Sequence, residues 1–430
     1  MFAVRRLPSS LTASAARATR RNATVAVASS TEWKPPETPT QGRRRRARTS
    51  RPEISLQQPR SWHRALPPGV VPAYDLALQL LQHDSRVLKQ EIASLQESLK
   101  EKEAAYQALQ SKAAKASAEE KVTLEENLRS IDQELERMLE KLNILEVQSE
   151  VNLPDVRWSV NNAMADMTKA SHRHLLEQKW RKDGGLDLLM ERVYQMHVVP
   201  DALPEIHPGI DLRVAVPSGR YRPGKPYETV EPGSFLKPKQ TIAPPNLYVN
   251  VFHTDVRLYT MLLLDLDVPH PEASTYSTYL HWLEPNIPLS ATSPSRLSLS
   301  NEHTPYIPPH PQQGTPYHRY VCLLLQQPPL SPSGYTLAGA RRAGDKPTSV
   351  HLDIPAVQDA DRFGFNVRDF VARWALESAK GGAVHMWREV WDSEVSKIYS
   401  DILKKDEPRY GQPPKFDRYA QLKQQKKYIL

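Results

Sequence analysis

The chain is poor in the residues that build redox centres, phosphate loops and membrane spans. It has one cysteine, Cys322, which excludes an internal disulfide and a multi-cysteine zinc site. There are 16 glycines against 38 prolines, and neither a P-loop nor a G-x-G-x-x-G, G-x-S-x-G or H-E-x-x-H pattern occurs. No run of eighteen apolar residues is present. We therefore expect no membrane insertion, no cofactor, no metal ion and no catalytic residue.

Acidic residues are missing from the start of the chain. No Asp or Glu precedes Glu32, whereas the first thirty residues hold five arginines among many Ser, Thr and Ala. This composition is typical of a mitochondrial presequence, which we assign to residues 1–30. An ordinary basic terminus is the alternative.

Positive charge is concentrated at the two ends of the chain. Residues 1–70 carry 14 Arg and Lys against three Glu, a net +11, so the other 360 residues sum to −3. Residues 404–430 are again basic, with a net +5. Basic extensions on a nearly neutral body predict an anionic partner, which is either nucleic acid or a membrane surface.

Residues 31–71 form a Pro-, Arg- and Gln-rich arm with too few apolar residues to fold by itself. Such an arm can lie along nucleic-acid phosphates and release their counterions. A solvated linker or a protease site is the alternative. The arginines that we expect to bind RNA are Arg43, Arg44, Arg45, Arg46, Arg48, Arg51, Arg60 and Arg64.

Neither glycine nor proline occurs between Pro72 and Pro154, where two apolar series follow helical spacing. An eleven-residue gap from Ala113 to Leu124 separates their registers, and Ser117 with Glu120 fits a capping box. We favour two helices in a hairpin over one long helix with a stutter. Such a narrow seam needs a partner face, either within the hairpin or on another protein. The series are Leu88, Ile92, Leu95, Leu99, Tyr106, Leu109, Ala113 and Leu124, Leu128, Ile131, Leu135, Met138, Leu142, Leu145.

A third helical region runs from Asp155 to about Val198 and is interrupted at Gly184 and Gly185, so residues 72–200 are helical as a whole. His172 and His174 lie two positions apart and would point to nearly opposite sides of a helix. We expect both histidines at the surface, without a shared metal.

Residues 201–404 change character and alternate short β-branched and aromatic runs with Pro and Gly turns, which predicts a mainly antiparallel β domain. A final helix is expected at 393–404, and a basic tail covers 405–430. The predicted fold class is therefore α+β.

The segment LLLDLDVP, residues 262–269, carries the most suggestive polar pair. Positions i and i+2 of a strand face the same side, so Asp265 and Asp267 could hold a metal or act as an acid–base pair. Alternatively, Asp267 ends the strand before Pro269, and the carboxylates accept backbone N–H groups of a turn. Cys322 lies within VCLLL, a buried-strand pattern in which a thiol is inert.

Together with HWLEPNI and G-T-P-Y-H-R-Y further on, this segment resembles the phosphatidylethanolamine-binding protein family. DRFGFNVRDFVARWAL and GGAVHMWREVWDSEVSKIY extend the resemblance over residues 205–404. The family implies two packed antiparallel sheets with a small anion pocket at one end. The positions that match its pocket are Asp265, Asp267, His281, His318, Tyr320 and Tyr399.

The sequence departs from the family pattern at the expected pocket mouth. Leu266 replaces a proline, and Pro308-Pro309-His310 replaces Gly-Ser-Gly unless a shifted register places the prolines on the family's own pair. Gln312 and Pro316 are further departures. Glycine lets an anion approach backbone N–H groups, and proline has no N–H to donate. We expect no small-molecule ligand in this pocket.

The order of presequence, basic arm, helical hairpin and altered domain resembles the ribosomal branch of this family, in its fungal form. That resemblance implies a structural protein of the mitochondrial large ribosomal subunit, whose partners are rRNA and other large-subunit proteins in the mitochondrial matrix. The alternative is a soluble regulator that binds an anion or phospholipid head group through Asp265, His281 and His318. A coiled-coil adaptor and an enzyme have less support.

Overall fold

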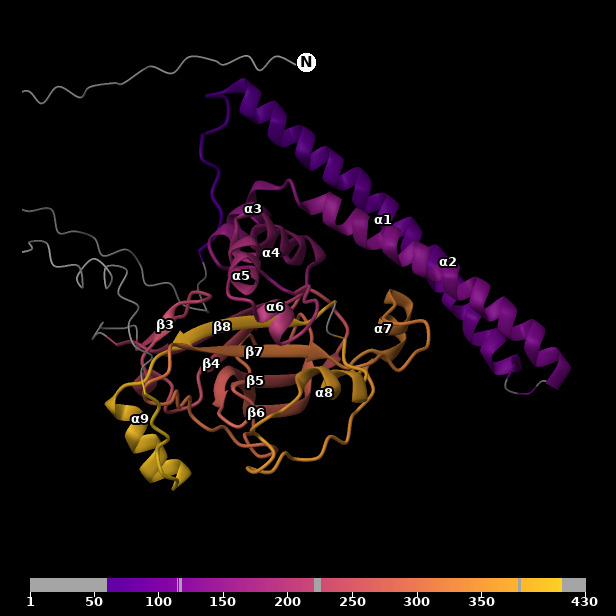
Figure 1. Ribbon diagram of the computed structural model, residues 1–430. Coiled ribbons are helices and arrows are strands. Elements are labelled where there is room, and N and C mark those ends of the chain that lie inside the picture. Colours follow the sequence, from indigo (N-terminus) through magenta and orange to yellow (C-terminus); the bar gives the residue numbers. More distant parts are fainter. Residues whose placement is uncertain (1–59, 114, 116–117, 220–225, 378–379, 412–430) are drawn as a thin grey trace, which may run out of the picture. The chain divides into compact units, whose positions relative to one another are not determined.

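The computed structural model describes residues 60–411, apart from 114, 116–117, 220–225 and 378–379. The expected presequence, the arm with Arg43 to Arg48 and Arg51, the Ser117 capping box and the tail from residue 412 therefore lie outside the described residues. The described part consists of helices followed by a β domain, which confirms the predicted α+β class (Figure 1).

The first two helices form the predicted hairpin. Helix α1 spans Pro72–Ala113 and α2 spans Ala118–Glu150, and they lie side by side (Figure 1). Leu99, Leu135 and Leu142 of the predicted seams are buried between them. Ion pairs such as Lys102–Glu134, at 2.6 Å, flank this seam. Because exposed ion pairs contribute little stability, the buried leucines hold the hairpin together.

Four short helices follow where the sequence predicts one interrupted region. They are α3 (Pro154–Asn161), α4 (Ala170–Lys182), α5 (Gly185–Gln195) and α6 (Val198–Asp201). The predicted break at Gly184 is confirmed, since this residue has φ +85° and precedes α5. The break between α3 and α4 was not predicted.

The prediction that His172 lies at the surface is wrong. Its side chain is 5% exposed, and its Nδ1 accepts a hydrogen bond of 3.0 Å from the backbone N–H of Asp166. The segment between α3 and α4 therefore folds over this face of α4, and burial lowers the pKa of His172. His174 is half-buried and hydrogen-bonds Gln178.

Two sheets form the β domain. In the smaller sheet β1 (Asp211–Pro217) lies between β2 (Tyr227–Thr229) and β4 (Asn246–Asn250). The larger sheet has the order β3-β8-β7-β5-β6, and all its pairs are antiparallel except β3 with β8. These strands span Phe235–Leu236 (β3), Ala383–Glu389 (β8), His318–Gln326 (β7), Arg257–His270 (β5) and Thr275–Leu289 (β6).

The larger sheet is covered on both faces, which explains why its strands read as nearly continuous apolar runs. Leu262 and Leu264 of β5 pack with the helical side, in one cluster with Val193 of α5. Met261 and Leu263 pack with β1 and β4 of the smaller sheet in a second cluster. The alternation along β5 therefore divides one strand between two cores.

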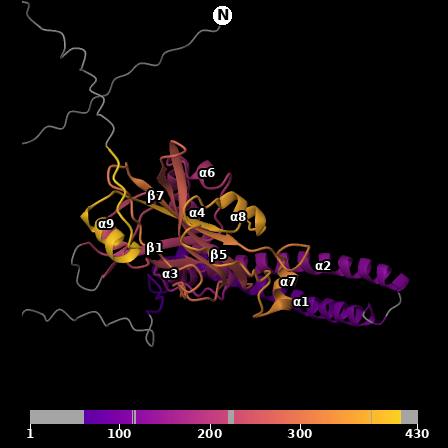
Figure 2. The ribbon, with the colours of Figure 1, turned by 60° about the horizontal axis from the view of Figure 1, so that its bottom comes forward.

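Helix α7 (Leu337–Ala343) joins the β domain to the hairpin (Figures 1 and 2). The two carboxylate oxygens of Glu136 on α2 accept the backbone N–H groups of Leu337 and Ala338, each at 2.8 Å. Arg341 and Arg342 of α7 pair with Glu103 and Asp132 of the hairpin. The carboxylate of Glu136 thus lies at the N-terminus of α7, where the helix dipole is positive.

The chain closes with α8 (Val367–Arg373), α9 (Ser393–Lys397) and one π-helical turn, Ile398–Leu403. The predicted final helix at 393–404 is therefore confirmed. In the described part of the chain, no helix is both long and apolar enough to cross a bilayer.

Replacing Leu99 by alanine should lower the free energy of unfolding of the hairpin by about 2–5 kcal/mol, because this side chain is fully buried. Hydrogen exchange of the α1 and α2 amides measures the change. The matched variant Leu80→Ala lies on the same helix but is 69% exposed, and it should alter stability by less than about 0.5 kcal/mol. Equal effects of the two variants would contradict the hairpin seam.

Candidate functional site

The two aspartates of β5 do not form a shared site. The strand continues to His270 instead of ending at Asp267, which corrects the predicted strand end. Its pairing with β6 is irregular between Asp265 and Val268, so the regular alternation of side chains is interrupted there. The carboxylates consequently bond two successive residues of β7, His318 and Arg319.

Asp265 and His318 form a buried ion pair. The Nδ1–H of His318 donates to Oδ2 of Asp265 at 2.7 Å, and both side chains are at most 2% exposed. The hydroxyl of Thr315 donates to the carbonyl of Gln312, so its oxygen accepts the Nε2–H of His318 at 2.9 Å. His318 therefore uses both ring nitrogens as donors, which requires the charged imidazolium.

The pKa values agree with this assignment. Burial opposes the charged form of His318, but the neighbouring Asp265 carboxylate outweighs it and raises the pKa of His318. Burial also opposes ionisation of Asp265, yet the charge and hydrogen bond of His318 lower its pKa. The imidazolium is thus neutralised within the fold.

The neutral ring of His281 has its one N–H already bonded within the chain. Its Nδ1–H donates to the carbonyl of Ile307 at 2.8 Å, which leaves Nε2 as a lone-pair acceptor. No hydrogen-bond partner of Nε2 is found among the described residues. Burial, followed by the proximity of His310, lowers the pKa of His281 to about 3, so the ring stays neutral.

The imidazole of His310 fills the centre of this cluster. Its ring centroid lies 5.0 Å from those of Tyr279 and His281 and 5.4 Å from that of Tyr399. Its Nδ1–H donates to the carbonyl of Pro308 at 2.9 Å, and burial lowers its pKa. The sequence analysis named His310 only as a departure from the family pattern at the expected pocket mouth. The replacement of a small residue by a bulky ring was the signal that could have predicted its place in the cluster.

The loop around this cluster is covered by the end of the described chain. The backbone N–H of Tyr410 donates to the carbonyl of Gln313 at 2.8 Å. Gly314 has φ +90°, and a Cβ there would collide with the carbonyl oxygen of Tyr410. Glycine is therefore needed both for the turn and for the close approach.

Most of the predicted pocket positions come together, with one exception. Tyr320 lies 5.4 Å from His281 and 6.5 Å from His318 between ring centroids, and Tyr399 contacts His310. Asp267 instead forms a 2.7 Å ion pair with Arg319, whose guanidinium also bonds Asp201 of α6 at 2.8 Å. Asp267 therefore links β5 and β7 to the helical layer.

The charged and ring groups of this cluster are largely bonded within the chain. The imidazolium of His318 is paired, the neutral rings of His281 and His310 offer lone pairs, and Arg319 is held by two carboxylates. No group of three or more His, Cys, Asp or Glu is placed to hold a metal ion anywhere in the described residues. Burial raises the pKa of Cys322 to about 12, which keeps the thiol protonated and unreactive.

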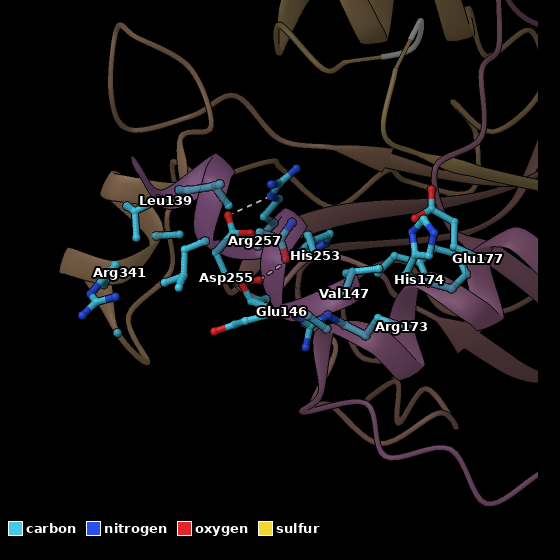
Figure 3. A pocket seen from close by; sticks show the side chains of 18 residues that line it. Leu139, Glu146, Val147, Arg173, His174, Glu177, His253, Asp255, Arg257 and Arg341 are labelled. Atoms are coloured by element: carbon cyan, nitrogen blue, oxygen red, sulfur yellow. Dashed lines mark hydrogen bonds and ion pairs between the residues drawn. The ribbon is translucent and has the colours of Figure 1, made fainter. Parts of the chain in front are cut away.

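Away from this cluster, a hollow of about 490 Å³ lies between α2, α4, α7 and the loop at 252–257 (Figure 3). Its polar groups are largely bonded within the chain. Asp255 pairs with Arg257 at 2.8 Å, and Arg173 donates to the carbonyls of Met167 and Thr168. The hollow separates the hairpin from the β domain and carries no recognisable reactive pair.

Two of the predicted RNA-binding arginines are described. Arg60 is exposed, whereas Arg64 pairs with Asp75 and lies 5.1 Å from the ring centroid of Tyr74. The charge of Arg64 is thus partly compensated within the chain. Contact of either arginine with phosphate stays a prediction.

Glu389 provides a test of the buried cluster. It is fully buried, accepts hydrogen bonds from Trp387 and Thr241, and has its pKa raised from 4.5 to about 8 by burial. The folded protein therefore binds a proton that the unfolded chain releases above pH 4.5, so stability declines as pH rises from 4.5 to about 8.

Glu389→Gln should remove this decline, which amounts to a few kcal/mol at about 1.4 kcal/mol per unit of pKa shift. Urea unfolding of the wild type and the variant between pH 5 and about 9 measures the difference. A constant difference in stability across this range would show that Glu389 does not titrate in the folded protein.

Parts of this chain are similar to known proteins. The model of the family "Phosphatidylethanolamine-binding protein" matches residues 227–380. Large ribosomal subunit protein mL38 of Schizosaccharomyces pombe is 28% identical over 257 residues, which are 60% of this chain and 73% of that protein. Protein MOTHER of FT and TFL1 homolog 2 of Oryza sativa is 30% identical over 140 residues, 33% of this chain and 64% of that protein.

Among solved structures, the phosphatidylethanolamine-binding protein from Plasmodium vivax matches with a TM-score of 0.29 and 16% identity, covering 47% of this chain and 97% of that chain. The family-model match lies within the β domain and includes Asp265, His281 and His318. This chain therefore carries a phosphatidylethanolamine-binding-protein-like domain.

Proposed function

We propose that this protein is a structural constituent of the mitochondrial large ribosomal subunit and supports mitochondrial translation. Its basic extensions contact rRNA, and its helical and phosphatidylethanolamine-binding-protein-like regions contact neighbouring large-subunit proteins. It works in the mitochondrial matrix, without enzymatic activity and without a small-molecule ligand.

The similarity to a large ribosomal subunit protein carries this proposal. A match of 257 residues cannot fit within residues 227–380, so it extends into the regions that flank the family-model match. A protein that shared only the binding domain would not explain the additional length. The presequence-like composition of residues 1–30 supports a mitochondrial location.

The filled cluster supports a scaffold rather than a head-group-binding regulator. A regulator would need unpaired donors or a net positive charge aimed at a cavity. Here His310 packs among the rings of Tyr279, His281 and Tyr399, while the one imidazolium is neutralised by Asp265. The retained side chains therefore stabilise the end of the β domain.

Sedimentation tests the proposed function. The tagged full-length protein, expressed in the cells from which it comes, should co-sediment with the mitochondrial large ribosomal subunit in a gradient at moderate salt. Detection at the top of the gradient, with the subunit intact, would refute the ribosomal assignment.

A charge series tests the role of the arm. We expect release from the subunit at lower salt when glutamine replaces Arg43, Arg44, Arg45, Arg46 and Arg48, because each lost phosphate contact weakens binding. Each lost contact should also reduce the slope of log K against log salt concentration by about one. Lysine at the same five positions keeps the charge and should restore retention. If the glutamine variant sediments like the wild type at every salt concentration, the arm does not anchor the protein.

Ligand addition tests the scaffold role. Millimolar phosphorylethanolamine should leave the melting temperature of the purified protein unchanged, since only a ligand that binds the folded state stabilises it. His310→Ala should lower the melting temperature, because it leaves a cavity among packed rings. A ligand-dependent rise in the melting temperature of the wild type, abolished by His281→Ala, would favour the regulator instead.

A further inference from the structure

The first helix extends beyond the end of its partner in the hairpin. Glu150, the last residue of α2, pairs with Lys89 at 3.0 Å, so most of residues 72–88 lie past the end of α2 (Figure 1). Among the described residues, the buried cluster of the hairpin reaches back only to Ile92. We call residues 72–88 the α1 extension, which is about 25 Å long.

The α1 extension is apolar over a wider arc than a two-helix seam needs. Two lines of apolar side chains run along it at helical spacing, about 120° apart around the helix. The first line continues the seam and consists of Leu78, Leu81 and Leu88. The second line, which we call the second stripe, consists of Leu76, Leu80 and Val87. An apolar arc of this width indicates a helix that is covered on more than one side.

The second stripe is exposed in the isolated chain. Leu76, Leu80 and Val87 are 65%, 69% and 48% exposed. The segment that precedes the helix folds against a different side, where Arg64 pairs with Asp75 and lies over the ring of Tyr74. Large apolar side chains that follow one another along one face of a helix mark an interaction surface.

One uncompensated charge lies among these apolar side chains. Asp84 falls between the two apolar lines and takes part in no ion pair within the described part of the chain. Arg86 is the only Arg or Lys in residues 72–88, and two positions along a helix place it on nearly the opposite side from Asp84. There its Nε donates to the carbonyl of Gln82. The apolar arc therefore carries one negative charge and no positive charge.

We propose that the α1 extension packs against an amphipathic helix of a neighbouring large-subunit protein. The apolar stripe of that helix covers the second stripe and continues the seam beyond the end of α2. A lysine or arginine within the stripe pairs with Asp84. This inference rests on the proposed ribosomal function and names the surface and the kind of partner that the helical region uses.

The charge of the α1 extension favours this occupant over the other two candidates. RNA needs cations, whereas the apolar arc presents none and Asp84 would repel phosphates. A second copy of this chain would bring another Asp84 and no cation on its own arc, so both carboxylates would lie between apolar faces without a partner. A helix with one basic residue in its apolar stripe satisfies both the leucines and the carboxylate.

Site-specific photo-crosslinking tests the inference. A benzophenone analogue of phenylalanine is placed at position 76, 80 or 87 of the tagged full-length protein, or at position 82, which faces away from the second stripe. After irradiation of intact mitochondria, positions 76, 80 and 87 should form adducts with successive turns of one helix in a single large-subunit protein. Position 82 should give at least about fivefold less adduct, because it lies on the other side of the helix.

Substitution of Asp84 tests the expected charge complementarity. With the photoreactive group at position 80, Asp84→Lys should reduce the adduct at least about fivefold, because like charges would then face each other. Asp84→Glu keeps the charge and should preserve the adduct. Glu126→Lys is the matched control, since it makes the same change of charge at an exposed position of α2 and should have no effect.

The identity of the adducts decides between the occupants. Adducts with rRNA, with a second copy or within the chain itself would overturn the inference, as would equal yields from positions 80 and 82 or an unchanged yield in Asp84→Lys. If the protein co-sediments with the large subunit but gives no such adduct, the inference fails and the proposed function stands. A stripe-specific adduct with a helix of a non-ribosomal protein, without co-sedimentation, would refute the ribosomal assignment and support the helix-binding surface.

Discussion

The β domain depends on the pairing of two carboxylates of β5 with two successive cations of β7. Asp265 neutralises the buried imidazolium of His318, and Asp267 neutralises Arg319, which also bonds α6. Removing Asp265 or His318 would leave a buried charge without compensation, which is far costlier than the loss of a surface ion pair. The same pairing removes the positive charge that an anion would need. One set of contacts therefore stabilises the domain and closes its pocket.

The excess positive charge of the chain lies at its two ends. Residues 1–70 and 404–430 hold all of the excess arginine and lysine, while residues 71–403 between them carry 35 Arg and Lys against 43 Asp and Glu, a net −8. Within the β domain, the ring of His310 occupies the space between Tyr279, His281 and Tyr399. Under the proposed function, this domain serves as a folded body between the two basic ends of the chain.

Local patterns predicted the elements, and long-range packing decided the site. The seams around Leu99 and Leu135 predicted the hairpin because helical periodicity is written in consecutive residues. His281 and His318 were brought to one cluster through the family resemblance, since spacing in sequence gives no hint of their proximity. The separation of Asp265 from Asp267 follows from an irregularity in the β5–β6 pairing, which strand periodicity does not encode. Likewise, His172 looked exposed because the loop that covers it leaves no periodic signal.

Helix α7 shows how order in this protein is shared between distant segments. Seven residues, one of them Gly339, are too few for a stable isolated helix. Its first three N–H groups are satisfied by Glu136, some two hundred positions earlier, and by Thr336. The helical state of this segment is consequently conditional on the hairpin, so a chain that lacked residues 72–150 would lose a turn of structure in a loop of the β domain that the deletion never touched.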